Sequence, residues 1–166
     1  MDYGMIGKIE KAKLYASQPD RITFNTLVAE FRGDNNTYRI TLSPGGWSCS
    51  CPGFRSHSIC PHIMALEKLY KAELKRAPLP YAPGQNVVSD VDKAMRYAEE
   101  PDRLRFVEFE VTFRGDYDTH ITAYRDNHFA CGCEFFHSRG VCGHTMALER
   151  VFHGQIEPAQ ASPAAI

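Results

Sequence analysis

The sequence has no long hydrophobic run and no leader of the secretory type. Its first residues lack the basic stretch and apolar core of a signal peptide, and no window approaches the ~18 apolar residues that a membrane-spanning helix needs. We therefore expect a cytoplasmic protein. A large charge of one sign is also lacking, because 19 Lys and Arg stand against 20 Asp and Glu. Such a balance does not describe a chain that coats nucleic acid without specificity.

Cysteine is scarce, with six among 166 residues, and all six fall into one repeated pattern. Disulfide bonds are a poor explanation for it, since cysteines one residue apart are awkward partners and a reducing compartment keeps thiols free. Metal binding is the commoner use of clustered cysteines in that setting.

The two halves of the sequence align with each other without a gap. Positions 11–70 fall on positions 93–152, and more than a third of the aligned positions are identical, which indicates a duplicated module. The Phe-Arg-Gly-Asp stretch at 31–34 recurs at 113–116, for example. We divide the chain into module 1 (1–76), a proline-rich linker (77–86), module 2 (87–154) and a tail (155–166) that we predict to be disordered.

Each copy holds three cysteines and one histidine at the spacing Cys-x-Cys-x8-Cys-x-His. The predicted metal ligands are Cys49, Cys51, Cys60 and His62 in module 1, and Cys131, Cys133, Cys142 and His144 in module 2. Three thiolates and one imidazole form a closed tetrahedral set for zinc. We therefore predict two structural Zn2+ ions, one per repeat, each contributing on the order of 10 kcal/mol to folding.

The shared hydrophobic pattern predicts an α+β fold made of two tandem repeats of helix, β-hairpin, zinc-bound strand segment and helix. Apolar residues recur at helical spacing over 5–16 and 87–98, with Ser89 as the predicted N-cap of the second helix. Alternation over 107–113, turn residues, and a returning extended run at 38–42 or 119–124 predict the hairpin. A third extended piece carries Trp47 or Phe129 into the first two cysteines, and the last helix spans 62–75 or 144–153.

This arrangement resembles the SWIM zinc finger, and the resemblance covers both halves of the chain. It includes an aromatic residue shortly before the first cysteine, here Trp47 and Phe129, and the apolar runs 63–66 and 145–148 after each histidine. SWIM modules occur beside helicase-like ATPases and transposases and are thought to bind DNA or proteins. The resemblance therefore implies a binding module, although no ATPase or nuclease domain accompanies the fingers in this sequence.

Two alternatives to structural zinc remain. Buried free cysteines are one. The other is an iron–sulfur site, because CDGSH-type clusters also begin Cys-x-Cys-x8-Cys. Their histidine lies three residues further along, however, and neither copy contains the Cys-Asp-Gly-Ser-His run.

For the function we expect a non-catalytic adaptor that docks nucleic acid, a protein partner, or both, in trans, as in a helicase, transposase or polymerase assembly. Neither an open coordination position nor a nucleophile or paired-carboxylate motif occurs in both copies, so we expect no enzymatic activity, no small-molecule substrate and no membrane partner. A purely structural subunit of a larger complex is the alternative, and an iron–sulfur redox protein is less favoured.

The two halves differ in charge, which bears on the choice of partner. Residues 1–82 carry 11 Lys and Arg against 7 Asp and Glu, whereas residues 83–166 carry 8 against 13. The acidic second half favours a protein partner. The basic residues of module 1 are candidates for contact with phosphate: Arg32, Arg39, Arg55, Lys68, Lys71, Lys75 and Arg76. Alternatively, the three lysines form the solvated face of an amphipathic helix.

Overall fold

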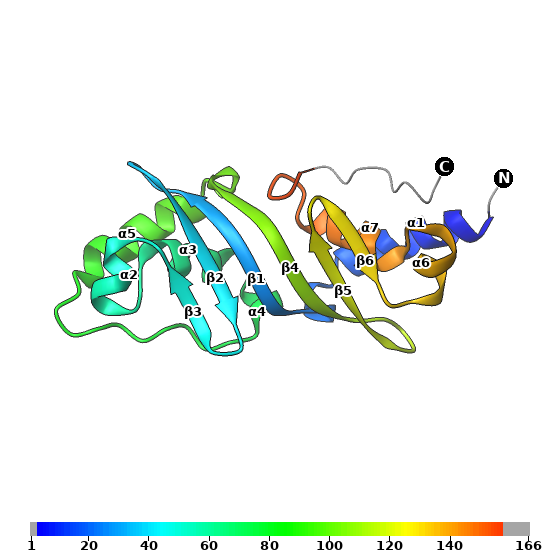
Figure 1. Cartoon of the computed structure of the whole chain (residues 1–166), viewed down its shortest axis with the longest axis horizontal. Helices are drawn as coiled ribbons and strands as arrows, with labels where there is room; N and C mark the ends of the chain where they lie inside the picture. The colour runs from blue at the N-terminus through cyan, green and yellow to red at the C-terminus, as the bar shows by residue number, and fades with distance from the viewer. Residues whose placement is uncertain (1–2, 158–166) are drawn as a thin grey trace.

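The two β-hairpins join into one antiparallel sheet. In the computed structural model, which describes residues 3–157, the strand order is β3-β2-β1-β4-β5-β6 (Figure 1). The central pair, β1 and β4, takes one strand from each repeat, so the sheet is continuous across the duplication. The strands are β1 (Ile22–Arg32), β2 (Thr37–Ser43), β3 (Gly46–Cys49), β4 (Leu104–Arg114), β5 (Thr119–Arg125) and β6 (His128–Cys131).

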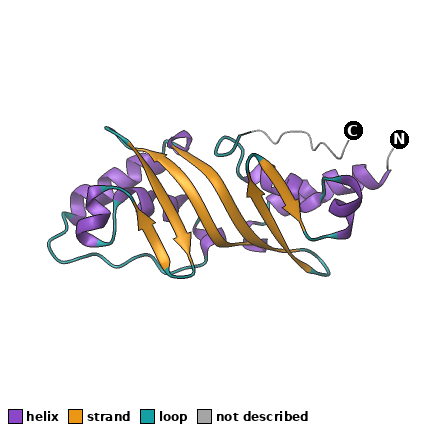
Figure 2. Cartoon of the chain, in the orientation of Figure 1, coloured by secondary structure: helices purple, strands orange, loops and turns teal. Residues whose placement is uncertain are grey.

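The described helices gather on one face of the sheet and leave the other face uncovered (Figure 2). Five helices pack there: α1 (Tyr3–Ala16), α3 (Pro61–Leu69), α4 (Lys71–Leu74), α5 (Val87–Ala98) and α7 (Gly143–Val151). Short helices α2 (Pro52–His57) and α6 (Glu134–Arg139) lie in the loops between the cysteines, and single 3-10 turns η1 (Pro19–Arg21) and η2 (Pro101–Arg103) precede the long strands. None of the described helices is long and apolar enough to cross a membrane.

An approximate two-fold axis relates the repeats and passes between β1 and β4. Leu27 lies opposite Phe109, which is its own counterpart in the second repeat. Ile22 pairs with Phe113 at one end, and Phe31 pairs with Leu104 at the other. The interface between the repeats therefore has the self-complementary character of a two-fold symmetric dimer.

The first helix of each repeat packs on the last helix of the other repeat. Helix α1 lies along α7, and α5 lies along α3. The strand register explains this exchange, because Ile22 at the start of β1 lies beside Phe113 at the hairpin end of β4. The helix that leads into β1 must therefore arrive at module 2, and the helix that leads into β4 at module 1. The repeats are units of sequence, but packing crosses between them.

Aromatic side chains fill the core where the repeats meet. Phe24 and its counterpart Phe106 have ring centroids 5.5 Å apart, and the counterparts Tyr70 and Phe152 are 5.4 Å apart. All four, together with Phe109, are buried. Large aromatic rings bury much apolar area per residue. The shared core therefore buries more apolar area than the core of either repeat would bury alone.

The predicted α+β elements are confirmed, with three local differences. The loops between the second and third cysteines contain the helices α2 and α6, which were not predicted because such short segments show no clear periodicity. The helix expected over 62–75 is interrupted at Tyr70, where φ is −125°. Helix α5 begins at Val87 and is capped by Asn86, whose side chain accepts a hydrogen bond from the Ser89 amide, so the predicted cap at Ser89 is wrong.

The segment 155–157 is held in place. The Phe106 amide donates to the Gln155 carbonyl over 2.7 Å, the Tyr70 hydroxyl donates to Gln155 Oε1 over 3.1 Å, and Arg105 pairs with Glu157 at 2.9 Å. The disordered tail predicted from residue 155 is therefore wrong for these three residues, and its remainder, 158–166, lies outside the described residues. The linker 77–86 contains neither helix nor strand.

Because packing crosses between the repeats, residues 1–78 alone are expected not to form a folded monomer. The fragment lacks the partner for β1 and the helix that packs on α3, so it should pair with a second copy through the same register. Size-exclusion chromatography with light scattering checks this, and co-expression with residues 79–166 is expected to give a one-to-one complex instead. A folded, zinc-loaded monomer of 1–78 would contradict the prediction.

Candidate metal centres

Each Cys/His set forms a compact cluster of four donors. The four donor atoms of Cys49, Cys51, Cys60 and His62 lie within 4.8 Å of one another, and so do those of Cys131, Cys133, Cys142 and His144. In a tetrahedral zinc site, bonds of about 2.3 Å to sulfur and 2.0 Å to nitrogen separate sulfur from nitrogen by about 3.5 Å. The Nδ1 atom of His144 lies 3.6 Å from Cys131 Sγ and 3.7 Å from Cys142 Sγ. The donors present therefore fit zinc.

The cysteines begin the helices that follow them. The Cys51 sulfur caps α2 by accepting a hydrogen bond from the Phe54 amide at 3.4 Å. Cys60 caps α3 and Cys142 caps α7 in the same way. A helix N-terminus favours negative charge, so the local fold stabilises the thiolates that zinc requires. The first cysteine of each set ends a strand, and the metal joins the hairpin to the helices.

Proton sharing among the sulfurs shifts their pKa values in opposite directions. The pKa of Cys51 is held well below its usual range because the thiols of Cys49 and Cys60 donate hydrogen bonds to its sulfur. A hydrogen bond from Cys142, and another from His144, lower the pKa of Cys131 to about 3. The pKa values of Cys60 and Cys142 are raised, first by donating such hydrogen bonds and also by burial. Zinc binding must therefore displace protons from the remaining thiols.

Each ligand histidine stacks on a tyrosine from the other repeat. His62 of module 1 lies 5.7 Å from Tyr97 of α5, with the rings inclined by 16°. His144 of module 2 lies 6.0 Å from Tyr15 of α1, inclined by 14°. Both tyrosines are 1% exposed. Each zinc site is therefore completed by a side chain that belongs to the other half of the sequence.

An arginine lies over the ring of each tyrosine and also binds the hairpin of the other repeat. The Arg103 guanidinium lies 4.7 Å from the Tyr97 ring, and Arg103 also donates to the backbone carbonyl of Arg32 over 2.8 Å. Arg21 does the same on the other side, with the Tyr15 ring at 4.4 Å and the Arg114 carbonyl at 2.9 Å. The order arginine, tyrosine, histidine is thus the same at both sites.

The Phe-Arg-Gly-Asp stretch shared by the repeats ends the long strand of each repeat and begins the hairpin turn. The tyrosine and the arginine side chains bind to this turn. The amide of Asp34 donates to the Tyr97 hydroxyl, and the Arg96 side chain binds both carboxylate oxygens of Asp34 at 3.1 and 2.7 Å. The hydrogen bond from Arg96 lowers the pKa of Asp34 to about 2. In module 2 the Asp116 amide donates to the Tyr15 hydroxyl, and its carboxylate pairs with Arg21 as that of Asp34 pairs with Arg103. The counterpart of Arg96 is Leu14, so the contact of Arg96 with both carboxylate oxygens is specific to Asp34.

The glycine of this stretch is needed for space beside the ligand histidine. A Cβ atom at Gly33 would lie 3.2 Å from His62 Nε2 and 3.2 Å from the Asn36 carbonyl oxygen. At Gly115 the corresponding distances are 3.4 Å to His144 Nε2 and 3.0 Å to the Asp118 carbonyl oxygen. Any larger residue would press on the imidazole that holds the metal.

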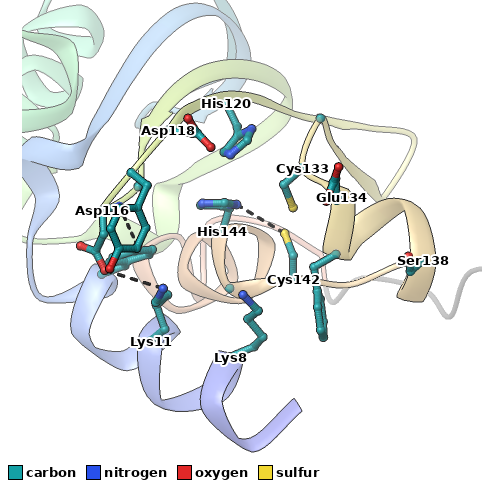
Figure 3. A pocket seen from close by; sticks show the side chains of 16 residues that line it. Lys8, Lys11, Asp116, Asp118, His120, Cys133, Glu134, Ser138, Cys142 and His144 are labelled. Atoms are coloured by element: carbon teal, nitrogen blue, oxygen red, sulfur yellow. Dashed lines mark hydrogen bonds and ion pairs between the residues drawn. The ribbon is translucent and has the colours of Figure 1, made fainter. Parts of the chain in front are cut away.

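The two metal sites differ in their surroundings. All four ligands of module 1 are buried, whereas His144 in module 2 is partly exposed. A cavity of about 690 Å³ opens beside Cys133, Cys142 and His144. Figure 3 shows Lys8 pointing towards this site from α1, while Lys11 pairs with Asp116 at 3.7 Å. Module 2 is the more accessible of the two.

The seven basic residues predicted as phosphate contacts do not share one surface. Lys68, Lys71 and Arg76 line a common hollow. Arg32 pairs with Asp102 at 3.5 Å, and the Lys75 ammonium donates to the Ile22 carbonyl. The other two are exposed elsewhere: Arg39 on β2 and Arg55 on α2. Sequence reasoning did not identify Tyr15, Tyr97, Arg21 and Arg103 as site residues, although their identity in both copies was a signal.

These features define two zinc-binding modules, each with three sulfur ligands and one nitrogen ligand. Residues 38–71 match the family model of the SWIM zinc finger. This segment is therefore a SWIM zinc finger, and the second Cys/His set, at the corresponding positions of the second repeat, fits a second module of the same kind. Searches of curated proteins and of solved structures find no match to the chain.

Two zinc ions per chain are expected, with one lost when a ligand is replaced. Serine is close to cysteine in size but binds zinc weakly, so Cys60→Ser should leave the ion of module 2 and Cys142→Ser that of module 1. Native mass spectrometry counts the ions. Acidification should release both, because protons compete for the thiolates. Two ions retained in Cys60→Ser would contradict the assignment, and Ser56→Ala, in the same loop, is the control.

Each tyrosine belongs to one repeat and stacks on the ligand histidine of the other. Substitution of a tyrosine is therefore expected to disturb the metal site of the other repeat. Tyr97→Ala should loosen the metal bound by Cys49, Cys51, Cys60 and His62, and Tyr15→Ala the other metal, because removal of a buried aromatic ring costs about 3–5 kcal/mol. Cadmium-113 NMR of the metal-exchanged chain follows the two sites separately, with Cys60→Ser and Cys142→Ser assigning the signals. Tyr97→Phe and Tyr15→Phe keep the ring and are the matched controls. Loss of the signal from the tyrosine's own module would contradict the exchange.

Proposed function

We propose that the chain is a non-catalytic, zinc-dependent adaptor that docks a macromolecular partner. The observation that carries the proposal is the closure of both metal sets, since four protein donors converge at each site. Tetrahedral zinc with four protein ligands has no position left for a substrate or a reactive water. The function then falls to the surfaces that the metals hold in place.

A protein is the partner that the uncovered sheet face favours. Side chains of the two central strands alternate between the core and this face. The outward-facing positions include Glu108 and Glu110, which flank the axis residue Phe109 on β4. Glu30 lies further along β1, between Arg39 and Arg105 of the neighbouring strands. Carboxylates at the centre of a broad face repel phosphate, whereas a protein surface can match them. Arg105 already neutralises Glu30 in part, at 3.5 Å.

Nucleic acid is the second candidate, supported by the excess of basic residues in residues 1–82. A few Lys and Arg contacts would give an affinity that falls steeply with salt and depends little on base sequence. A purely structural subunit of a larger complex is a further alternative, because a closed zinc site serves it equally well.

The tagged, zinc-loaded chain is expected to capture a partner from native lysate. The doubly substituted chain Cys60→Ser/Cys142→Ser should not capture it, because zinc holds the binding surfaces in place. Fluorescence anisotropy with single- and double-stranded DNA and RNA, from low to physiological salt, checks the second candidate. A salt-sensitive complex would move the assignment to nucleic acid. Release of the captured partner by brief dilution separates an adaptor from a permanent subunit.

X-ray absorption at the zinc edge tests the non-catalytic part of the proposal. Three sulfur atoms and one nitrogen are expected around each ion. Fewer than three sulfur atoms or more than one nitrogen or oxygen atom around an ion would contradict it, as would a visible absorption band from an iron–sulfur cluster.

A further inference from the structure

Beside the first metal module lies an apolar hollow of about 450 Å³. Its walls come from Trp47 of β3, Met64 and Leu74 of the helices α3 and α4, and Leu79 and Tyr81 of the segment that joins α4 to α5. Figure 1 shows that segment running as a long irregular loop past the β2–β3 edge. The hollow is lined mainly by apolar side chains, so it can bury one large apolar side chain of a partner.

Three cationic side chains surround this hollow without partners in the described chain. Lys68, Lys71 and Arg76 line it, and none of their side chains forms an ion pair or hydrogen bond with a described residue. The only acidic lining residue, Glu67, accepts a hydrogen bond from the Leu79 amide at 3.1 Å and so holds the far wall. With Glu67 counted against the three cations, the lining residues carry a net formal charge of +2 around an apolar floor.

We infer that this hollow, from here on the groove, binds an acidic peptide segment of a partner protein. An aliphatic or aromatic side chain of the peptide packs on Trp47, Met64 and Leu79. Its carboxylates pair with Lys68, Lys71 and Arg76. The inference rests on the proposed function and names the partner's chemistry. Complementary charge supplies orientation and partner selection, while the buried anchor supplies affinity. Methionine suits such a site because its flexible side chain adapts to different anchors.

A nucleic acid fits the groove less well. A strand needs basic residues spaced along a track for successive phosphates, whereas the other basic residues of module 1 lie elsewhere: Arg32 is paired with Asp102, Lys75 binds the Ile22 carbonyl, and Arg39 and Arg55 are on β2 and α2. Aliphatic walls also offer no stacking surface beyond the two aromatic rings. Three charges around one hollow match a short anionic segment better.

The test uses the full zinc-loaded chain and a phage library of random decapeptides that lacks tryptophan. Selected peptides are expected to be rich in Asp and Glu and to carry one or two large apolar residues. Trp47 is the only tryptophan in the chain, so a selected peptide, made synthetically, should change its fluorescence and give a dissociation constant. The charge-reversed chain Lys68→Glu/Lys71→Glu should weaken binding by about tenfold or more. The matched control, Arg39→Glu/Arg55→Glu, reverses two exposed charges away from the groove and should bind normally.

Three outcomes would overturn the inference: selected peptides without acidic residues, equal binding by Lys68→Glu/Lys71→Glu and wild type, or a Trp47 response to an oligothymidine that exceeds the response to the peptides. The last would assign the groove to nucleic acid. Lysate capture separates this failure from failure of the adaptor proposal. If Lys68→Glu/Lys71→Glu still captures the same partner as the wild type, the adaptor function stands and the partner docks on another surface.

Discussion

The antiparallel pairing of β1 with β4 is the interaction on which the rest of the structure depends. It places Leu27 opposite its own counterpart Phe109 and brings the start of each strand beside the hairpin turn of the other repeat. The preceding helices are thereby delivered to the opposite metal sites. Two repeats with thin separate cores become one unit around a shared aromatic cluster, and the larger unit buries a greater fraction of its surface.

Zinc binding and the packing of each first helix on the other repeat depend on each other through the ligand histidines. The metal fixes His62, His62 stacks on Tyr97, and Tyr97 with Arg103 holds the turn at Asp34. Exposed ion pairs in that turn contribute roughly 0.2–1 kcal/mol each, whereas structural zinc contributes on the order of 10 kcal/mol. Zinc therefore contributes far more to stability than these ion pairs, which hold the turn beside the buried tyrosine. Loss of one metal ion is therefore expected to lower the stability of both repeats.

The sequence predicted the ligands and the elements because both depend on short spacings. Cys-x-Cys between a strand end and a helix start, and Cys-x-His at the next helix start, are local patterns, and their recurrence at matching positions of the second repeat made them specific. The exchange of α1 and α5 was out of reach, because hydrophobic periodicity shows that a helix has an apolar face but not which repeat covers it. The same limit applies to Arg32: as a basic residue of module 1 it was a candidate for phosphate contact, yet it pairs with Asp102, just as its counterpart Arg114 pairs with Asp20.

The approximate symmetry also explains where the two modules are free to differ. Residues at the axis pack against both repeats, and each arginine–tyrosine–histidine stack joins a helix of one repeat to the metal site of the other, so a change at either place alters contacts between the repeats. Residues on the outer sides of the helices and at the sheet edges serve one module only. Lys68 and Lys71 lie in that outer region, as does the segment 78–81, which follows the first repeat and joins it to the second. A groove with its own charge can therefore exist at one module without any cost to the paired core.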